Sequence, residues 1–189
     1  MDVPGSYRGL KNLFDGESVE VRGFFEHLPN LLTATFPYDV AIAYLFSRVE
    51  LAHNSTLYYG AVKLHRCHPD VTWSAIDSSH MTRPAFRARF RMIFGKDLDS
   101  AIAKNIEAAE RVRDRIVHGK STTEAAKREA IASILEYAEG FNNFLSGLAG
   151  FKPFGQDMRG FKGRATSLDK ATTHWVLKGM GLWTELKEG

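Results

Sequence analysis

The sequence contains a single cysteine, Cys67, among 189 residues, so no disulfide can form within the chain. One unpaired cysteine is typical of proteins kept in a reducing compartment, which predicts a cytoplasmic location. No apolar run approaches the roughly 18 residues that cross a bilayer, so we expect no membrane partner. The first residues, MDVPGSYRGLKNLF, lack a charged lead followed by an apolar stretch, and this predicts that no signal peptide is present.

The sequence also lacks the valine-rich alternation of apolar and polar residues that indicates β-strands. Apolar residues recur instead at intervals of three and four, as they do in amphipathic helices. We therefore predict an all-α fold, an up-and-down helical bundle with a C-terminal arm. The composition changes after Gly150, which places the bundle and its N-terminal arm at residues 1–150. The arm at 151–189 is basic, rich in glycine and aromatic residues, and contains a short capped helix.

Helix boundaries can be placed from capping residues and glycines. Helices are predicted over residues 39–66, 83–94, 97–118 and 124–148, with a short helix in 17–27 that ends before Pro29. Thr82 is the expected N-cap of the second of these, and Gly119 the residue that ends the third. Ser121 and Glu124 have the spacing of a capping box before the fourth. Residues 67–84 are predicted to be a connector with turn-forming residues.

Positive charge is unevenly distributed along the chain. The net charge is only +3, yet residues 83–120 contain ten Lys/Arg and five Asp/Glu. Arg83, Arg87 and Arg91 recur every four residues and form a basic ridge on one helix face. Such a ridge either follows a phosphate backbone or is an ordinary solvated face.

The densest part of this region is the segment RVRDRIVHGK at 111–120. On a helical wheel, Arg113 falls in the middle of the apolar stripe of its helix. A guanidinium there must extend to solvent, pair with an acid, or line a site that requires a fixed positive charge. Asp114 and His118 are four residues apart and can touch. A carboxylate beside an imidazole either raises its basicity for catalysis or simply stabilises the helix end.

The segment RDRIVHG resembles the R-polar-x-x-x-H motif of the HEPN superfamily, small α-helical bundles that include many metal-independent ribonucleases. Arg113 matches the arginine, Asp114 the polar position and His118 the histidine, and the resemblance covers roughly residues 38–148. It implies an RNA-cleaving site and a homodimer in which two copies of the motif line one cleft. Asn is common at the second position of the motif, so Asp114 is a departure that brings negative charge close to the phosphate.

The spacing of arginine and histidine alone has little specificity. Two further copies of R-x4-H occur in the chain, at Arg22–His27 and Arg48–His53. These copies have Gly and Val at the second position, where the motif has a polar residue. Only the copy at 113–118 combines a polar second residue, a helix end and basic neighbours.

The resulting hypothesis is an endoribonuclease that cleaves single-stranded RNA by attack of its own 2′-hydroxyl, without a metal or cofactor. His118 acts as base or acid, and Arg113 grips the phosphate. A toxin or defence effector, held by a cognate inhibitory protein, is one role for such an enzyme. The alternative is a non-catalytic module that binds RNA, a nucleotide or a partner protein. The expected RNA-binding residues are Arg83, Arg87, Arg91, Arg111, Arg115 and Lys120.

Two other clusters are weaker candidates. His65, Cys67 and His68 could ligate a metal, but no second cluster stands at zinc-like spacing, so a turn beside Pro69 is the better interpretation. The aromatic residues of the arm, Phe151, Phe154 and Phe161, either stack on bases or pack the arm onto the bundle, and packing is the more common outcome.

Overall fold

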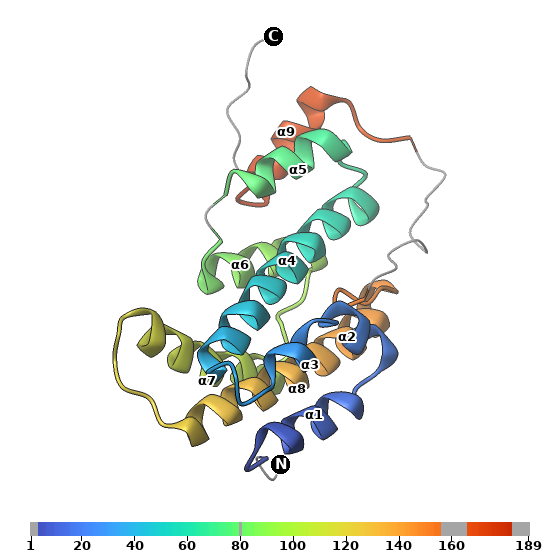
Figure 1. The fold of residues 1–189 in the computed structure, drawn as a ribbon. Helices are drawn as coiled ribbons and strands as arrows, with labels where there is room; N and C mark the ends of the chain where they lie inside the picture. Colours follow the sequence, from blue (N-terminus) through green and yellow to red (C-terminus); the bar gives the residue numbers. More distant parts are fainter. Residues whose placement is uncertain (1–3, 80, 156–165, 183–189) are drawn as a thin grey trace. The chain divides into compact units, whose positions relative to one another are not determined.

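The computed structural model describes residues 4–79, 81–155 and 166–182, and these residues form helices without any strand. The predicted all-α fold is therefore confirmed (Figure 1). Among the described residues, none of the helices is both long and apolar enough to cross a membrane. The helices are α1 (Tyr7–Asp15), α2 (Val19–Phe24), α3 (Leu28–Leu31), α4 (Tyr38–Leu64), α5 (Pro69–Asp77), α6 (Arg83–Phe94), α7 (Ser100–Val117), α8 (Glu124–Ala149) and α9 (Lys170–Gly179).

The chain divides into two compact units, and the division falls within α4. Unit 1 comprises Met1–Leu51 and Asp99–Met158, and therefore contains α1–α3, the first part of α4, α7 and α8. Unit 2 comprises Ala52–Leu98 and Arg159–Gly189, and contains the rest of α4 with α5, α6 and α9. Each unit is described separately below.

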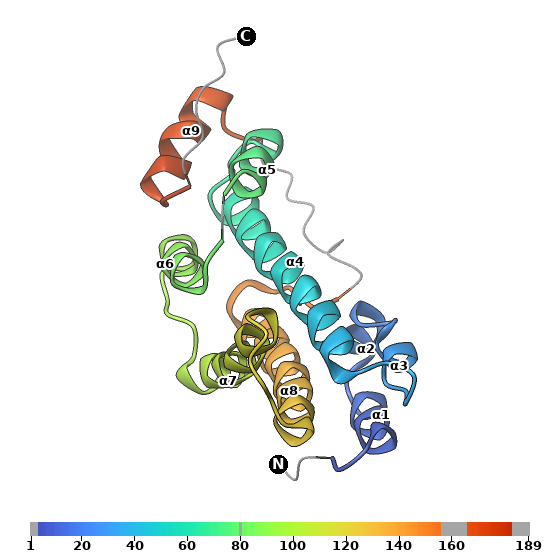
Figure 2. The ribbon, with the colours of Figure 1, turned by 60° about the vertical axis from the view of Figure 1, so that its left-hand side comes forward.

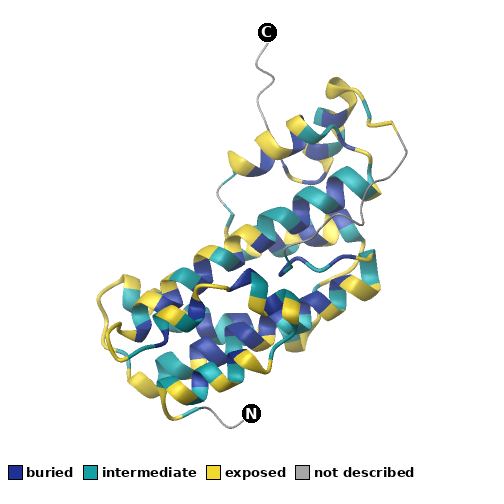
Figure 3. Cartoon of the chain, turned by 45° about the vertical axis from the view of Figure 1, so that its right-hand side comes forward, coloured by how far each residue is buried: buried dark blue, intermediate teal, exposed yellow. Residues whose placement is uncertain are grey.

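In unit 1, α8 is the central helix, and it packs along α7 (Figure 2). Its buried residues extend from Ala130 to Leu145, and α7 buries Ala103, Ile106 and Ala109. Of the apolar stripe predicted for α7, Ile106 and Ala109 are buried, whereas Ile102 and Ile116 are half-buried. Gly140 of α8 faces Ile102 of α7, where a Cβ would make an ordinary van der Waals contact at 3.4 Å. Figure 3 shows the buried positions of the helices beside exposed ones, as amphipathic helices require.

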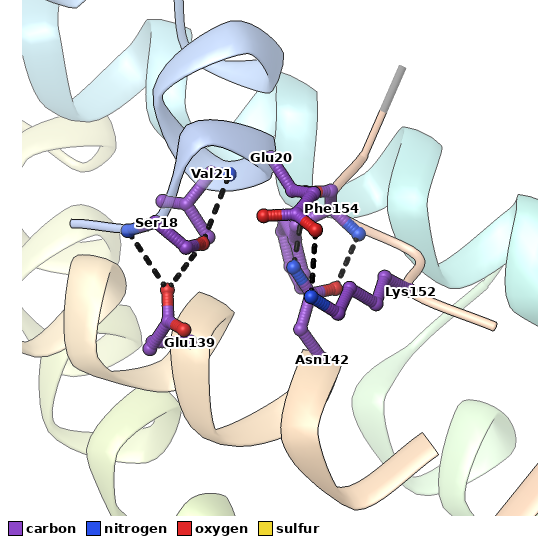
Figure 4. Close-up of polar contacts among 7 residues, drawn as sticks. All are labelled: Ser18, Glu20, Val21, Glu139, Asn142, Lys152 and Phe154. Atoms are coloured by element: carbon purple, nitrogen blue, oxygen red, sulfur yellow. Dashed lines mark hydrogen bonds and ion pairs between the residues drawn. The ribbon is translucent and has the colours of Figure 1, made fainter. Parts of the chain in front are cut away.

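The segment after α8 packs into unit 1 through Phe154, which is fully buried. Its ring lies 5.3 Å from the ring of Phe24 and 6.0 Å from that of Phe141. The buried Asn142 amide donates to the Phe154 carbonyl at 3.0 Å and accepts from the Phe154 N–H at 2.8 Å (Figure 4). Lys152 adds an ion pair of 2.6 Å with Glu20 of α2. Packing of the first arm aromatics, Phe151 included, is thus confirmed, and Phe161 lies outside the described residues.

In unit 2, the prediction of a connector over 67–84 was wrong, because Pro69–Asp77 forms α5. Pro69 occupies the first turn of this helix, where its missing N–H leaves no hydrogen bond unmade. Val71, Ala75 and Ile76 form its buried face, and α9 packs against the helix. The turn-forming residues of the segment surround the helix rather than replacing it.

Most predicted helix ends are confirmed. Thr82 caps α6, its hydroxyl accepting from the Ala85 N–H, and Gly95 ends that helix with a φ of 67°. The capping box at Ser121 was wrong, because Thr123 is the N-cap of α8 and accepts from Ala126. Near the N-terminus, the predicted short helix in 17–27 is confirmed as α2, which ends before Pro29, whereas α1 and α3 were not foreseen.

Glu17, just before α2, lies near Glu136 and Glu139 of α8. Burial, followed by the charges of these two acids, raises the pKa of Glu17 from 4.5 to about 6. Because the folded state holds this proton more tightly than the unfolded state, the associated stability is complete below pH 4.5 and is lost as the pH rises through about 6. At neutral pH, Glu17 therefore bears an unfavourable buried charge.

Replacing Glu17 with glutamine should accordingly stabilise the protein at about pH 7.5, by roughly 1 kcal/mol once solvent screening of this half-buried group is included. Urea unfolding at pH 7.5 and at pH 4.5 measures the effect, which should vanish at the lower pH. Glu129→Gln, at an exposed position of α8, is the matched control and should change little. A Glu17→Gln protein that is no more stable at pH 7.5 would disprove the repulsion.

Candidate active site

The end of α7 fixes the backbone around the motif through a Schellman arrangement. The Lys120 N–H donates to the Arg115 carbonyl at 2.8 Å, and the Gly119 N–H donates to the Ile116 carbonyl at 3.0 Å. Gly119 has a φ of 65°, a left-handed conformation that favours glycine. The sequence His-Gly therefore ends the helix and leaves His118 as its last residue, the C-cap.

Arg113 is partly buried, with 35% of its side chain exposed. Its guanidinium is held by two carboxylates: Asp114 Oδ1 lies 3.0 Å from Nη2, and Glu50 Oε1 of α4 lies 3.5 Å from Nη1. The guanidinium carbon also lies 5.0 Å from the ring centre of Phe46, within the range of a cation–π contact. An arginine in the apolar stripe was expected to require such a partner, and Glu50 and Asp114 supply the neutralising charge.

His118 is exposed, and within the described part of the chain its ring makes no hydrogen bond or ion pair. Asp114 directs its Oδ1 atom to Arg113. The four-residue spacing thus does not produce the Asp114–His118 pair that the sequence allowed. His118 instead presents its imidazole to solvent at the end of α7.

The basic neighbours of the motif have different surroundings. Arg115 is tied to the turn that follows, because its Nη2 and Nε donate to the Ser121 carbonyl at 2.7 and 3.2 Å. Arg111, within α7, and Lys120, in the turn, are both exposed. All three basic residues lie in unit 1 with the motif.

The remaining predicted RNA-binding residues lie on α6, in unit 2. Arg83 and Arg87 are half-buried, and Arg91 is exposed, with its Nε 3.8 Å from Asp97. Arg89, beside this ridge, donates from Nε to the Gly181 carbonyl at 3.1 Å. The ridge is therefore a surface of a different unit from the one that carries Arg113 and His118.

The two other R-x4-H copies have structural surroundings unlike those of the motif. His53 stacks on Phe86 with ring centroids 3.9 Å apart, and burial lowers its pKa from 6.5 to about 3. Arg48 lies over the Phe24 ring and donates to the Phe24 carbonyl. His27 is exposed and lies 3.7 Å from Glu26.

The His65–Cys67–His68 segment forms the turn into α5. His65 Nε2 lies 2.8 Å from the Ile93 carbonyl, and the His68 N–H donates to the Thr173 hydroxyl of α9. Cys67 is buried, which raises the pKa of its thiol to about 11. In the described residues, no three His, Cys, Asp or Glu side chains are arranged to hold a metal ion.

Glu50 and Phe46 were not singled out from the sequence. They are four residues apart on α4 and so share a helix face, but the chain offers many such pairs. Only the fold shows that this face of α4 meets Arg113. The chain matches no protein-family model, no curated protein and no solved structure.

Proposed function

We propose that the chain is a metal-independent endoribonuclease with a HEPN-like site at the end of α7. The observation that carries the proposal is the presentation of two complementary groups by one helix end: a positioned guanidinium, Arg113, and an exposed imidazole, His118. RNA cleavage by the 2′-hydroxyl needs a proton acceptor, a proton donor and a cation for the phosphorane-like transition state. These two residue types can supply those functions.

In the proposed reaction, a base takes the proton of the RNA 2′-hydroxyl, and the 2′-oxygen attacks the adjacent phosphorus. The bond from phosphorus to the 5′-oxygen breaks, and an acid protonates that oxygen. The products are a 2′,3′-cyclic phosphate and a 5′-hydroxyl. One subunit supplies one imidazole at this site, so we propose that the second comes from a partner copy, as the HEPN resemblance implies. Light scattering tests this pairing: the measured mass should be about twice the 21.2 kDa of one chain.

The two carboxylates beside Arg113 determine how a phosphate can reach it. Both the Glu50 and the Asp114 side chains are more than half exposed, and ion pairs in such settings contribute only about 0–1 kcal/mol each. A phosphate that forms two charge-assisted hydrogen bonds with the guanidinium can therefore displace one of these two carboxylates. The contact with Phe46 would keep the guanidinium in place during this exchange.

The first experiment is cleavage of single-stranded RNA by the purified protein in the presence of EDTA. We expect cleavage, with fragments that end in a 2′,3′-cyclic phosphate and begin with a 5′-hydroxyl. An absolute requirement for Mg²⁺ would contradict the metal-independent mechanism. Fragments with 5′-phosphates would contradict attack by the 2′-hydroxyl, because they indicate attack by an external water.

The second candidate function is a non-catalytic HEPN-like module that binds RNA, a nucleotide or a partner protein. The pairing of Arg113 with two carboxylates favours it, since this neutralises the cation that the reaction requires. A folded protein that binds RNA but produces no fragments at any RNA concentration would favour this module.

A further inference from the structure

The basic charge of the chain is concentrated in unit 2. Over its described residues, 52–79, 81–98 and 166–182, unit 2 has nine Lys/Arg and four Asp/Glu, a net charge of +5. The described residues of unit 1 have twelve Lys/Arg and fourteen Asp/Glu, a net charge of −2. An anionic partner is therefore attracted mainly by unit 2. The motif formed by Arg113, Asp114 and His118 lies in unit 1.

Helix α9 of unit 2 presents an unusual outer face. Its inner face is buried through Thr173 and Leu177 and packs with α5, and both views show the two helices side by side (Figures 1 and 2). On the outer face, the Trp175 side chain is 72% exposed. Among the large apolar side chains of the described residues, only Val117 is equally exposed. Lys178 lies one turn further along, with its Nζ 5.4 Å from the centre of the indole ring.

Helix α6 adjoins the same end of α9. Arg89 of α6 donates to the carbonyl of Gly181, which follows Lys178 by three residues. This contact ties the segment just after α9 to the face of α6 that carries Arg89. Arg91 of the ridge is two residues from Arg89, so it lies on another face of α6, where its Nε is 3.8 Å from Asp97. The acid of α9, Asp169, is at the opposite end, where it caps the helix through Thr172.

We propose that Trp175 and Lys178 form a binding surface for an unpaired stretch of RNA. An exposed indole provides a platform on which a base can stack, and neighbouring cations hold the backbone phosphates. The net positive charge of unit 2 attracts the negatively charged backbone of a nucleic acid more strongly than a protein with few acidic residues. The inference builds on the RNA-binding part of the proposed function, but it requires no catalysis at α7.

The test is the affinity of the full-length His118→Ala protein for a fluorescein-labelled oligouridylate of about 12 nucleotides, measured by anisotropy. His118→Ala removes the proposed cleavage from this assay, and all affinities are compared within this background. Added in that background, Trp175→Leu should weaken binding by about 5- to 100-fold, the usual effect of removing one stacking aromatic. Trp175→Phe keeps an aromatic face and should retain most of the affinity.

Two comparisons make the result specific. Lys178→Ala should reduce the slope of log affinity against log salt by about 0.7, the value for one lost phosphate contact on a single strand. Trp73→Leu, at the exposed tryptophan of α5 that packs on Tyr58, is the matched control and should change affinity little. The proposal is overturned by equal losses in Trp73→Leu and Trp175→Leu, by unchanged affinity in Trp175→Leu, or by no RNA binding at low salt. Retained binding without cleavage by the parent protein would instead count against the proposed enzyme alone.

Discussion

Replacing His118 with alanine is expected to lower the rate of RNA cleavage by at least about 100-fold, the scale for losing a general acid or base. The reason is that His118 is the imidazole that the end of α7 presents to solvent, five residues after Arg113. The fold should tolerate the change, because the ring of His118 is exposed and the helix end is held by backbone hydrogen bonds at Gly119 and Lys120. The single-turnover rate in EDTA, measured with circular dichroism as a check on folding, gives the result.

His27→Ala is the matched control for this prediction. His27 ends another R-x4-H copy and is also exposed, so its loss changes the same residue type without touching the proposed site. We expect its cleavage rate to stay within a few-fold of the parent. His53 is a poorer control than the sequence suggested, because its ring packs on Phe86 and its loss would leave a cavity. Equal rates for the His118→Ala protein and the parent would refute the assignment of His118.

Replacing Phe154 with alanine is expected to reduce the free energy of unfolding by about 3–5 kcal/mol, the usual cost of deleting a fully buried phenylalanine. The ring is surrounded by the aromatic side chains of four residues, and truncation would leave a cavity among them. These are Phe24, Phe25, Tyr137 and Phe141. Urea unfolding monitored by circular dichroism measures the loss.

The Asn142 contacts make the same region sensitive to a polar change. Asn142→Leu is nearly the same size, but it leaves the N–H and carbonyl of Phe154 without their partners in a buried setting. Such unpaired groups cost about 1–3 kcal/mol each. Phe36→Ala, at an exposed ring, is the control and should cost much less. If Phe154→Ala and Phe36→Ala cost the same, the segment after α8 is not part of the core of unit 1.

The sequence predicted the long helices well because their signals are local. Thr82, Gly95 and Gly119 have the roles that their positions relative to the apolar pattern indicated. The helix α5 was missed because Pro69 and the serines after Asp77 favour turns, and the stabilising contact with α9 is distant in sequence. The capping residue Thr123 was missed because Ser121 fits a capping-box pattern that the backbone does not use.

For the candidate site, the sequence identified the residues of α7 but not their partners. The position of Arg113 in an apolar stripe indicated a guanidinium that extends to solvent, pairs with an acid or lines a site. The four-residue spacing allowed Asp114 to pair with His118, but the structure pairs Asp114 with Arg113. The choice of Arg113 depends on Glu50 and Phe46, which are distant in sequence and come close only when α4 packs beside α7. Similarly, the sequence placed Arg83, Arg87 and Arg91 with the motif because they are close in sequence, whereas the fold assigns them to a separate unit.

The central claim is that the end of α7 directs the 2′-hydroxyl of RNA against its own phosphate without a metal. The most direct test is cleavage in EDTA of an RNA that carries one 2′-deoxynucleotide immediately 5′ of a mapped cut site. The account predicts that cleavage at this bond disappears while cleavage at other sites of the same RNA continues at the parent rate. Cleavage that persists at the 2′-deoxy position would contradict it, because the nucleophile would then be something other than the RNA's own 2′-oxygen.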